Sequence, residues 1–191
     1  KVAEMEYPEN ASFDMLGHMM QWFDHYLKGV DNGADRQPTV QYYAMGAVGE
    51  DDSPGNQWRK VDDWPVTASK TPYYLTASGG LVTTRPADNG GETRLDADPT
   101  NPAEIPGRGF PGARDGRAFE QQENVLTFSS DLLEQPVEWT GHVQAQLFVT
   151  STAPDTDFIV RISDVYPDGR SILILGYVHR VRYREGFHKE V

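Results

Sequence analysis

The stretch APDTDFIVRISDVYPDGRSILIL, residues 153–175, decides the fold class of this chain. Across residues 158–163 the side chains alternate with the period of two that is typical of a strand with one buried face. Residues 167–169, Pro-Asp-Gly, are the residue types that form a tight turn, and the apolar run 171–175 follows as a returning strand. The stretch therefore predicts an antiparallel β-hairpin.

Short β-rich runs recur along the rest of the chain. Clusters of Gly, Pro, Asn and Asp separate them, which is the pattern of an all-β sandwich or barrel. Region 85–117 is dense in Pro, Gly and Asp and longer than an ordinary connection, so we interpret it as a loop with a functional role. The predicted strands are 40–45, 73–76, 125–128, 143–150, 158–162, 171–175 and 178–183.

One long helix is predicted over residues 13–29. Apolar residues follow one another there at spacings of three and four, which places them on one face of a helix. Asn10 or Ser12 can cap the start of this helix, and Gly29 is a typical helix end. The periodicity then changes from helical to strand-like, so we expect a domain boundary within residues 30–38.

Composition excludes several classes of function. The 191 residues include 29 acidic and 17 basic side chains, a formal net charge of −12. This acidity argues against binding to nucleic acid or to an anionic membrane, because both need clustered Lys and Arg. No apolar run has the length of a membrane span. Cysteine is absent, which excludes disulfides, thiolate catalysis and Cys-based zinc sites and leaves the cellular compartment undetermined.

Residue groups that could hold a metal or a cofactor have simpler interpretations. His18 and His25 lie about two turns apart on the predicted helix, too far apart to chelate one metal ion. Residues 107–112 fit Gly-x-Gly-x-x-Gly, but no helix follows them, so we reject a dinucleotide site. The aspartates of 155–168 could bind Ca²⁺, although hydrogen bonding at turns and strand ends is the interpretation that we favour. No metal and no cofactor are predicted.

The hairpin stretch also carries a resemblance. The succession RISDVYPDGRS and RVRYREG, with WFDHYLKG and DPTNP before it, is similar to the C-terminal part of the X-Pro dipeptidyl-peptidase and CocE/NonD family of serine hydrolases. That family also contains esterases and acylases. The motifs occur in the family's order over almost all of residues 13–187. Further motifs in this order are Met45-Gly46, Trp58-Arg59, Trp64-Pro65 and Tyr73-Tyr74-Leu75.

The resemblance implies a fold and a division of the chain. Residues 33–191 are expected to form a mainly β domain, a jelly-roll β-sandwich of the galactose-binding type that lacks its last strands. Residues 1–32 are expected to be the C-terminal helix of an α/β-hydrolase catalytic domain. In the family the catalytic serine, acid and histidine precede this helix, and no Gly-x-Ser-x-Gly elbow occurs here. No catalytic residue is therefore assigned to this chain.

The resemblance also implies partners and substrate-facing residues. The expected partner is the upstream hydrolase domain of the same protein, the expected substrate is a small acyl compound or a peptide, and a homo-oligomer is left open. Gly109 and Phe110 match a family loop that leans over the catalytic mouth, so they are the candidate substrate-pocket residues.

Four charged residues are candidates for the interface with that hydrolase domain: Asp115, Arg117, Arg180 and Arg182. The alternative for them is a solvated or salt-bridged sheet face, which the excess of acidic residues favours.

Two other functions remain open for the whole chain. One is a free-standing binding module for carbohydrate or another ligand, for which Trp58, Trp64 and Trp139 are the candidate exposed aromatic residues. The other is a purely structural or oligomerisation domain.

Overall fold

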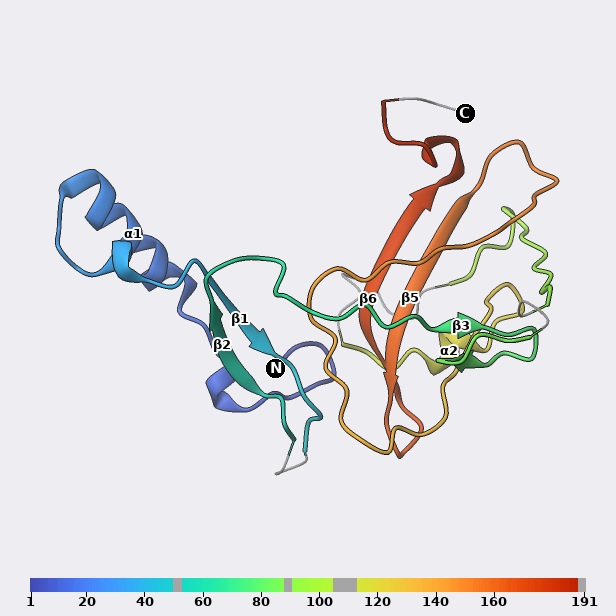
Figure 1. The fold of residues 1–191 in the computed structure, drawn as a ribbon, viewed down its shortest axis with the longest axis horizontal. Coiled ribbons are helices and arrows are strands. Elements are labelled where there is room, and N and C mark those ends of the chain that lie inside the picture. The colour runs from blue at the N-terminus through green and yellow to red at the C-terminus, as the bar shows by residue number, and fades with distance from the viewer. Residues whose placement is uncertain (50–52, 88–90, 105–112, 189–191) are drawn as a thin grey trace. The chain divides into compact units, whose positions relative to one another are not determined.

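A computed structural model describes residues 1–49, 53–87, 91–104 and 113–188 (Figure 1). Contacts divide the chain into two compact units. The first unit contains Lys1, Glu6–Ser69 and Pro136–His142, and the second unit contains Val2–Met5, Lys70–Gln135 and Val143–Val191. The expected domain boundary at residues 32–33 falls inside the first unit, so it stays a prediction.

The first unit contains the predicted long helix, α1 (Met15–Lys28). Asp14 caps its start, since one carboxylate oxygen accepts a hydrogen bond from the N–H of Gly17 at 2.9 Å. The predicted caps Asn10 and Ser12 are wrong. Asn10 lies within a separate 3-10 turn, so its side chain is not placed to meet the free N–H groups of the helix.

The end of α1 is confirmed at Gly29, which has the left-handed conformation with φ of +69°. Its N–H donates to the carbonyl of His25 at 3.0 Å, and the N–H of Val30 donates to the carbonyl of Asp24 at 3.1 Å. These two bonds satisfy carbonyl groups that the last turn of a helix leaves open. The short 3-10 helix η2 (Ala34–Arg36) follows.

An antiparallel hairpin forms the sheet of the first unit. It pairs β1 (Val40–Ala44), which the sequence predicts, with β2 (Gln57–Val61), which it does not. Tyr43 and Trp58 lie opposite each other in the register, with ring centroids 5.5 Å apart. The indole N–H of Trp58 donates to the carbonyl of Asn10 at 2.7 Å, which attaches the segment before α1 to the sheet.

Both faces of this hairpin have partners. On the face of Tyr43, the 3-10 helix η1 (Glu9–Ala11) is held because the phenol hydroxyl donates to the Asn10 side chain at 3.0 Å. Successive strand residues point to opposite faces, and on the other face Arg59 forms an ion pair with Glu138 at 2.8 Å. Segment Pro136–His142 is thereby joined to the first unit.

The predicted hairpin of the second unit is confirmed. It pairs β5 (Asp157–Val165) with β6 (Ser171–Arg180) in antiparallel register, and these are the long adjacent arrows in Figure 1. At the turn, Tyr166 accepts from the N–H of Gly169 and donates to the carbonyl of Arg170, both at 2.8 Å. Gly169 has a φ of +85°, which explains the glycine at this position.

The other elements of the second unit are short. The predicted strands 171–175 and 178–183 form one continuous strand, β6, and the 3-10 helix η3 (Val181–Tyr183) follows it. A second small sheet pairs β3 (Tyr74–Leu75) with β4 (Leu81–Val82). The four-residue helix α2 (Arg117–Glu120) begins at the last residue of region 85–117, which we predicted to be a loop.

The predicted strands 125–128 and 143–150 are wrong, because neither segment is a strand in the structure. Their apolar and β-branched residues give them the local preference of a strand, but a strand exists only when a neighbour completes its hydrogen-bond ladder. In the second of these segments Leu147, Phe148 and Val149 are 40%, 92% and 50% exposed.

The fold class is confirmed at the level of a mainly β chain. The described residues form three two-stranded antiparallel sheets and one long helix, and the jelly-roll sandwich remains a prediction. Among these residues the buried apolar side chains are Met5, Ala34 and Ile172. Most other large apolar side chains retain contact with solvent. No helix in the described ranges is long and apolar enough to cross a membrane.

Candidate functional site

One face of α1 is an exposed apolar surface of the first unit. Its members are spaced so that they share one side of the helix. Each of them is between 47% and 76% exposed. We call this surface the α1 stripe, and its residues are Met15, Leu16, Met19, Met20, Trp22, Phe23, Tyr26 and Leu27.

The opposite face of α1 is polar, and the chain that follows the helix covers it. The Gln21 side chain donates to the carbonyl of Asn32 at 2.9 Å, and the Asn32 side chain donates to the carbonyl of Gln21 at 2.7 Å. A ring nitrogen of His25 is hydrogen bonded to the carbonyl of Val30 at 2.9 Å. The helix is therefore attached through its polar face while the α1 stripe stays open. An apolar surface of this kind fits packing against another layer of protein.

In the second unit, Asp115 and Arg117 are bound to each other. The guanidinium of Arg117 donates to both carboxylate oxygens of Asp115, with its shortest bond at 2.6 Å. This hydrogen bonding lowers the pKa of Asp115 to about 2, even though partial desolvation acts in the opposite direction. The same bond raises the pKa of Arg117. Both members of the pair are therefore charged near neutral pH.

Ser171, at the start of β6, connects this pair to a third carboxylate. Its hydroxyl donates to Glu120 at 2.6 Å, and its N–H donates to Asp115 at 3.2 Å. The serine is only 2% exposed, so its polar groups are satisfied by protein partners. We call Asp115, Arg117, Glu120 and Ser171 the anchor cluster.

Arg180 and Arg182 share one carboxylate, that of Asp155. The guanidinium of each arginine donates to the same oxygen at 2.7 Å, and the N–H of Arg182 donates to the other oxygen at 3.2 Å. Partial desolvation raises the pKa of Asp155, but these hydrogen bonds outweigh it and the pKa lies below its ordinary value. The aspartate therefore acts in strand-end hydrogen bonding, as the sequence suggests.

All four predicted interface residues have partners within the second unit. Asp115 and Arg117 meet in the anchor cluster, and Arg180 and Arg182 meet at Asp155. An additional contact with another domain stays a prediction for them. The predicted pocket residues Gly109 and Phe110 lie outside the described residues.

The tryptophans singled out for carbohydrate binding differ in their surroundings. Trp58 is half-buried and bonded to Asn10, and its ring packs against Tyr43 and against Phe13 at 5.4 Å. Trp64 and Trp139 are 43% and 48% exposed. Only these two have the exposure that stacking on a sugar would need.

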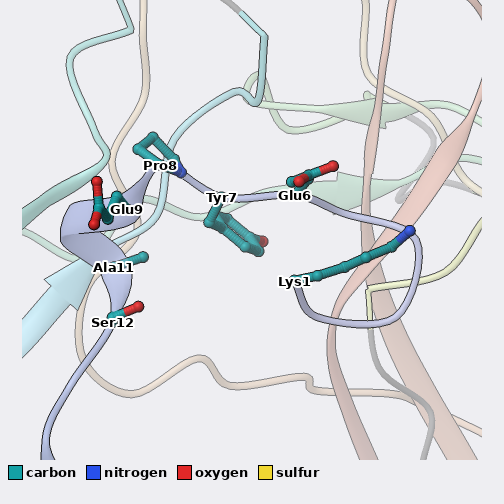
Figure 2. Close-up of a pocket in the computed structure, with 7 residues that line it drawn as sticks. All are labelled: Lys1, Glu6, Tyr7, Pro8, Glu9, Ala11 and Ser12. Atoms are coloured by element: carbon teal, nitrogen blue, oxygen red, sulfur yellow. The ribbon is translucent and has the colours of Figure 1, made fainter.

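A small open hollow lies beside η1 in the first unit, with a volume of about 360 Å³. Figure 2 shows Tyr7 between Ala11 and Ser12 on one side and Lys1 and Glu6 on the other. These residues do not include a histidine that could activate the hydroxyl of Ser12. The hollow therefore carries no catalytic arrangement.

No group of three or more His, Asp or Glu side chains within the described ranges is placed to hold a metal ion. Three of the described histidines make other contacts. His25 bonds a backbone carbonyl, His18 packs on Phe13 at 5.2 Å, and His179 stacks with Tyr177 at 6.3 Å.

Sequence reasoning missed the roles of Ser171 and Glu120. These two residues are 51 positions apart, and a hydrogen bond over that separation leaves no local pattern. The only available signal was the mixture of charged residues around the Asp-x-Arg motif at 115–117 in a region rich in Gly and Pro.

Comparison with known proteins identifies relatives of the chain. Residues 32–190 match the X-Pro dipeptidyl-peptidase C-terminal non-catalytic domain. The chain is similar to the cocaine esterase of Rhodococcus sp. strain MB1 Bresler, with 35% identity over 180 residues that cover 86% of this chain and 30% of that protein. It is also similar to Mb1866c of Mycobacterium bovis and MT1883 of Mycobacterium tuberculosis, both named as serine esterases. Each is 33% identical over 180 residues that cover 88% of this chain and 27% of that relative. The chain thus spans less than a third of the length of these relatives.

Proposed function

The chain belongs to the family of X-Pro dipeptidyl-peptidase C-terminal non-catalytic domains, and on this basis we propose that it is the non-catalytic C-terminal part of a serine hydrolase. The parent protein cleaves an acyl ester or amide bond, or releases an X-Pro dipeptide. Its nucleophile, acid and histidine lie in an upstream α/β-hydrolase domain. The present chain shapes the substrate pocket and forms the interface between the two domains.

The structural observation that carries the placement of this chain against a further domain is the α1 stripe. Burial of a large apolar side chain contributes roughly 1.5–3 kcal/mol, so a helix with eight exposed ones needs another protein surface for its stability. The polar face of α1 is already covered through Gln21 and His25, which leaves only the stripe for that surface. The upstream catalytic domain is the occupant that we propose.

The range of the family match supports the same division of the chain. The match begins at residue 32, after α1 has ended at Lys28. We therefore assign residues 1–32 to the catalytic domain, as its C-terminal helix, and residues 33–191 to the non-catalytic domain. A jelly-roll sandwich is the arrangement that we propose for the latter.

Substrate contact is assigned to Gly109 and Phe110. A rigid aromatic side chain between Gly and Pro suits the wall of an acyl pocket. Asp115, Arg117, Arg180 and Arg182 are proposed as rim residues of the domain interface, where they add contacts to the ion pairs they already make. A homo-oligomer of the parent is a further part of the proposal.

Covalent labelling of the full-length parent with a fluorophosphonate tests this function. We expect one labelled serine in the parent, protection by an acyl ester substrate, and no labelling of residues 1–191 alone. A parent that does not react would disprove the hydrolase proposal. In a reactive parent, Phe110→Ala should change the preference between small and bulky acyl esters by about tenfold.

A carbohydrate-binding module is the second candidate. It is favoured only by the exposure of Trp64 and Trp139. Calorimetric titration of the chain with neutral oligosaccharides distinguishes it: saturable binding that disappears in Trp64→Ala would support the module. Heat of dilution alone would remove this candidate.

A further inference from the structure

The segment before α1 is attached to the β1–β2 hairpin of the first unit. The carbonyl of Asn10 accepts from the indole N–H of Trp58 at 2.7 Å. The Asn10 side chain accepts from the hydroxyl of Tyr43 at 3.0 Å and donates to the carbonyl of Asn56 at 2.8 Å. Because Tyr43 belongs to β1 and Trp58 to β2, Asn10 bonds to both strands of the hairpin.

Ring contacts continue this attachment into the helix. The ring centroid of Phe13 lies 5.4 Å from that of Trp58 and 5.2 Å from that of His18. Trp58 is a residue of β2 and His18 is a residue of α1, so Phe13 connects the strand to the helix. His18 is not a member of the α1 stripe, and this contact therefore leaves the stripe open.

The other attachment of α1 is to the residues that lead into β1. The side chains of Gln21 and Asn32 each donate to the backbone carbonyl of the other residue, at 2.9 and 2.7 Å. The side-chain oxygen of Asn32 also accepts from the N–H of Ala34 at 3.1 Å, and Ala34 is 6% exposed. Asn32 therefore joins the polar face of α1 to a buried residue of η2.

We infer that α1 is a connector shared by two domains, and that Asn32 and Trp58 couple the stability of the catalytic domain to that of the β1–β2 hairpin. This inference rests on the proposed function, in which the upstream catalytic domain covers the α1 stripe. A helix that is bonded to one domain and packed against another cannot leave either without breaking contacts. The two domains should therefore lose their structure together rather than separately.

Three observations favour the catalytic domain over a second copy of this chain as the cover of the α1 stripe. The match to the non-catalytic domain begins at residue 32, so α1 lies outside it. The chain covers only 27–30% of its relatives, which therefore have enough additional residues for a further domain. The net charge of −12 opposes the close approach of two copies.

The second unit offers a matched hydrogen bond. The Asn124 side chain donates to the carbonyl of Asn101 at 3.0 Å, which has the same chemistry as the bond from Asn32 to the carbonyl of Gln21 at 2.7 Å. Neither Asn124 nor Asn101 belongs to α1 or to the segments that attach it. Replacing Asn32 and Asn124 in turn therefore compares similar losses of hydrogen bonding at two places, only one of which is assigned to coupling.

The experiment measures the half-life of p-nitrophenyl acetate hydrolysis by the full-length parent, held just below its melting temperature. Asn32→Ala should shorten this half-life by about threefold or more, because the lost hydrogen bonds weaken the attachment of α1. Asn124→Ala should leave the half-life within about twofold of the unsubstituted protein. Trp58→Phe keeps an aromatic ring but removes the N–H that bonds Asn10, so it should also shorten the half-life. It serves as well if Asn32→Ala fails to fold.

An unchanged half-life in both Asn32→Ala and Trp58→Phe would overturn the inference, as would an equal shortening in Asn124→Ala. A half-life that rises with protein concentration would show that a second copy covers the α1 stripe, which would overturn it too. Fluorophosphonate labelling separates this inference from the proposed function. An unlabelled parent refutes the proposed function, whereas a labelled parent whose variants keep the original half-life refutes only the coupling through α1.

Discussion

The anchor cluster and α1 differ in how their side chains are paired. Each belongs to a short segment that is attached to the rest of its unit by hydrogen bonds. At the anchor cluster the chain supplies every partner itself: a buried serine, two carboxylates and a guanidinium complete one another's hydrogen bonds. In α1 the described chain supplies hydrogen-bond partners for the polar face, through Asn32 and Val30. The residues of the α1 stripe stay 47–76% exposed among the described residues, so the apolar side has no comparable complement there.

This difference separates what the chain stabilises alone from what it needs a larger protein to stabilise. Polar groups in a partly buried place must be paired locally, because each unpaired one costs about 1–3 kcal/mol. Apolar side chains are less demanding of geometry, so their cover can come from any neighbouring layer. The following predictions test whether the two regions differ in this way.

The largest effect is expected at Ile172, which lies beside the anchor cluster and is 4% exposed. Ile172→Ala should lower the free energy of unfolding by about 2–4 kcal/mol, since it removes a buried side chain and leaves a cavity. Ile174→Ala, at a position that is 51% exposed, is the control, and its loss in free energy of unfolding should be much smaller. Urea denaturation measures the free energy of unfolding of both variants. Equal losses in the two would mean that Ile172 is not buried beside the anchor cluster.

A second prediction concerns Leu16 in the α1 stripe, which is 70% exposed. Leu16→Ser should change the stability of residues 1–191 by no more than about 0.5 kcal/mol. In the full-length parent, where we propose that this side chain is covered, the same substitution should cost about 1–3 kcal/mol. The test compares denaturant midpoints of residues 1–191 and of the full-length parent, each with and without Leu16→Ser. If the parent tolerates the substitution as well as the chain alone does, α1 is not covered by the catalytic domain.

A third prediction uses the pKa of Asp115, which is lowered from 3.8 to about 2, chiefly by the hydrogen bond from Arg117. Because the folded pKa lies below the unfolded one, protonation favours unfolding. The stabilisation from this group should be complete above about pH 4 and should disappear as the pH falls toward 2. Melting temperatures should therefore drop less steeply over this interval in Asp115→Asn. Parallel pH profiles for the two proteins would contradict the assignment.

The smallest effect is expected at the ion pair of Arg59 and Glu138, whose side chains are 35% and 43% exposed. Exposed pairs of this kind contribute about 0.2–1 kcal/mol. A double-mutant cycle with Arg59→Gln and Glu138→Gln should give a coupling energy in that range, and added salt should reduce it. A coupling energy well above about 1 kcal/mol, and insensitive to salt, would show that this ion pair is shielded from solvent, as the polar groups of the anchor cluster are.

These regions also explain which parts of the structure the sequence could predict. The β5–β6 hairpin and the end of α1 at Gly29 depend on neighbouring residues, so alternation, a Pro-Asp-Gly turn and a helix-ending glycine were sufficient. The start of α1 was misplaced because several residues could cap it, and only tertiary contacts decide that Asn10 bonds Tyr43 instead.

Features that depend on contacts between distant residues were harder to predict from the sequence. Strand β2 was not predicted because its mixed polar sequence QWRKV has no clear alternation, and it is fixed by pairing with β1. The bond between Ser171 and Glu120 joins positions that no short motif connects. The family resemblance, by contrast, was carried by motifs in order along the chain, and the comparison with known proteins confirmed it.

The segment Val143–Thr150, VQAQLFVT, has a practical consequence for anyone who produces this chain by itself. It is rich in β-branched and aromatic residues, has no charge, proline or glycine, and is not a strand within the described structure. Such segments stack into intermolecular cross-β assemblies when they are left exposed. We expect the isolated chain to associate through this segment as its concentration rises, so measurements on residues 1–191 require protein concentrations at which the chain is monomeric.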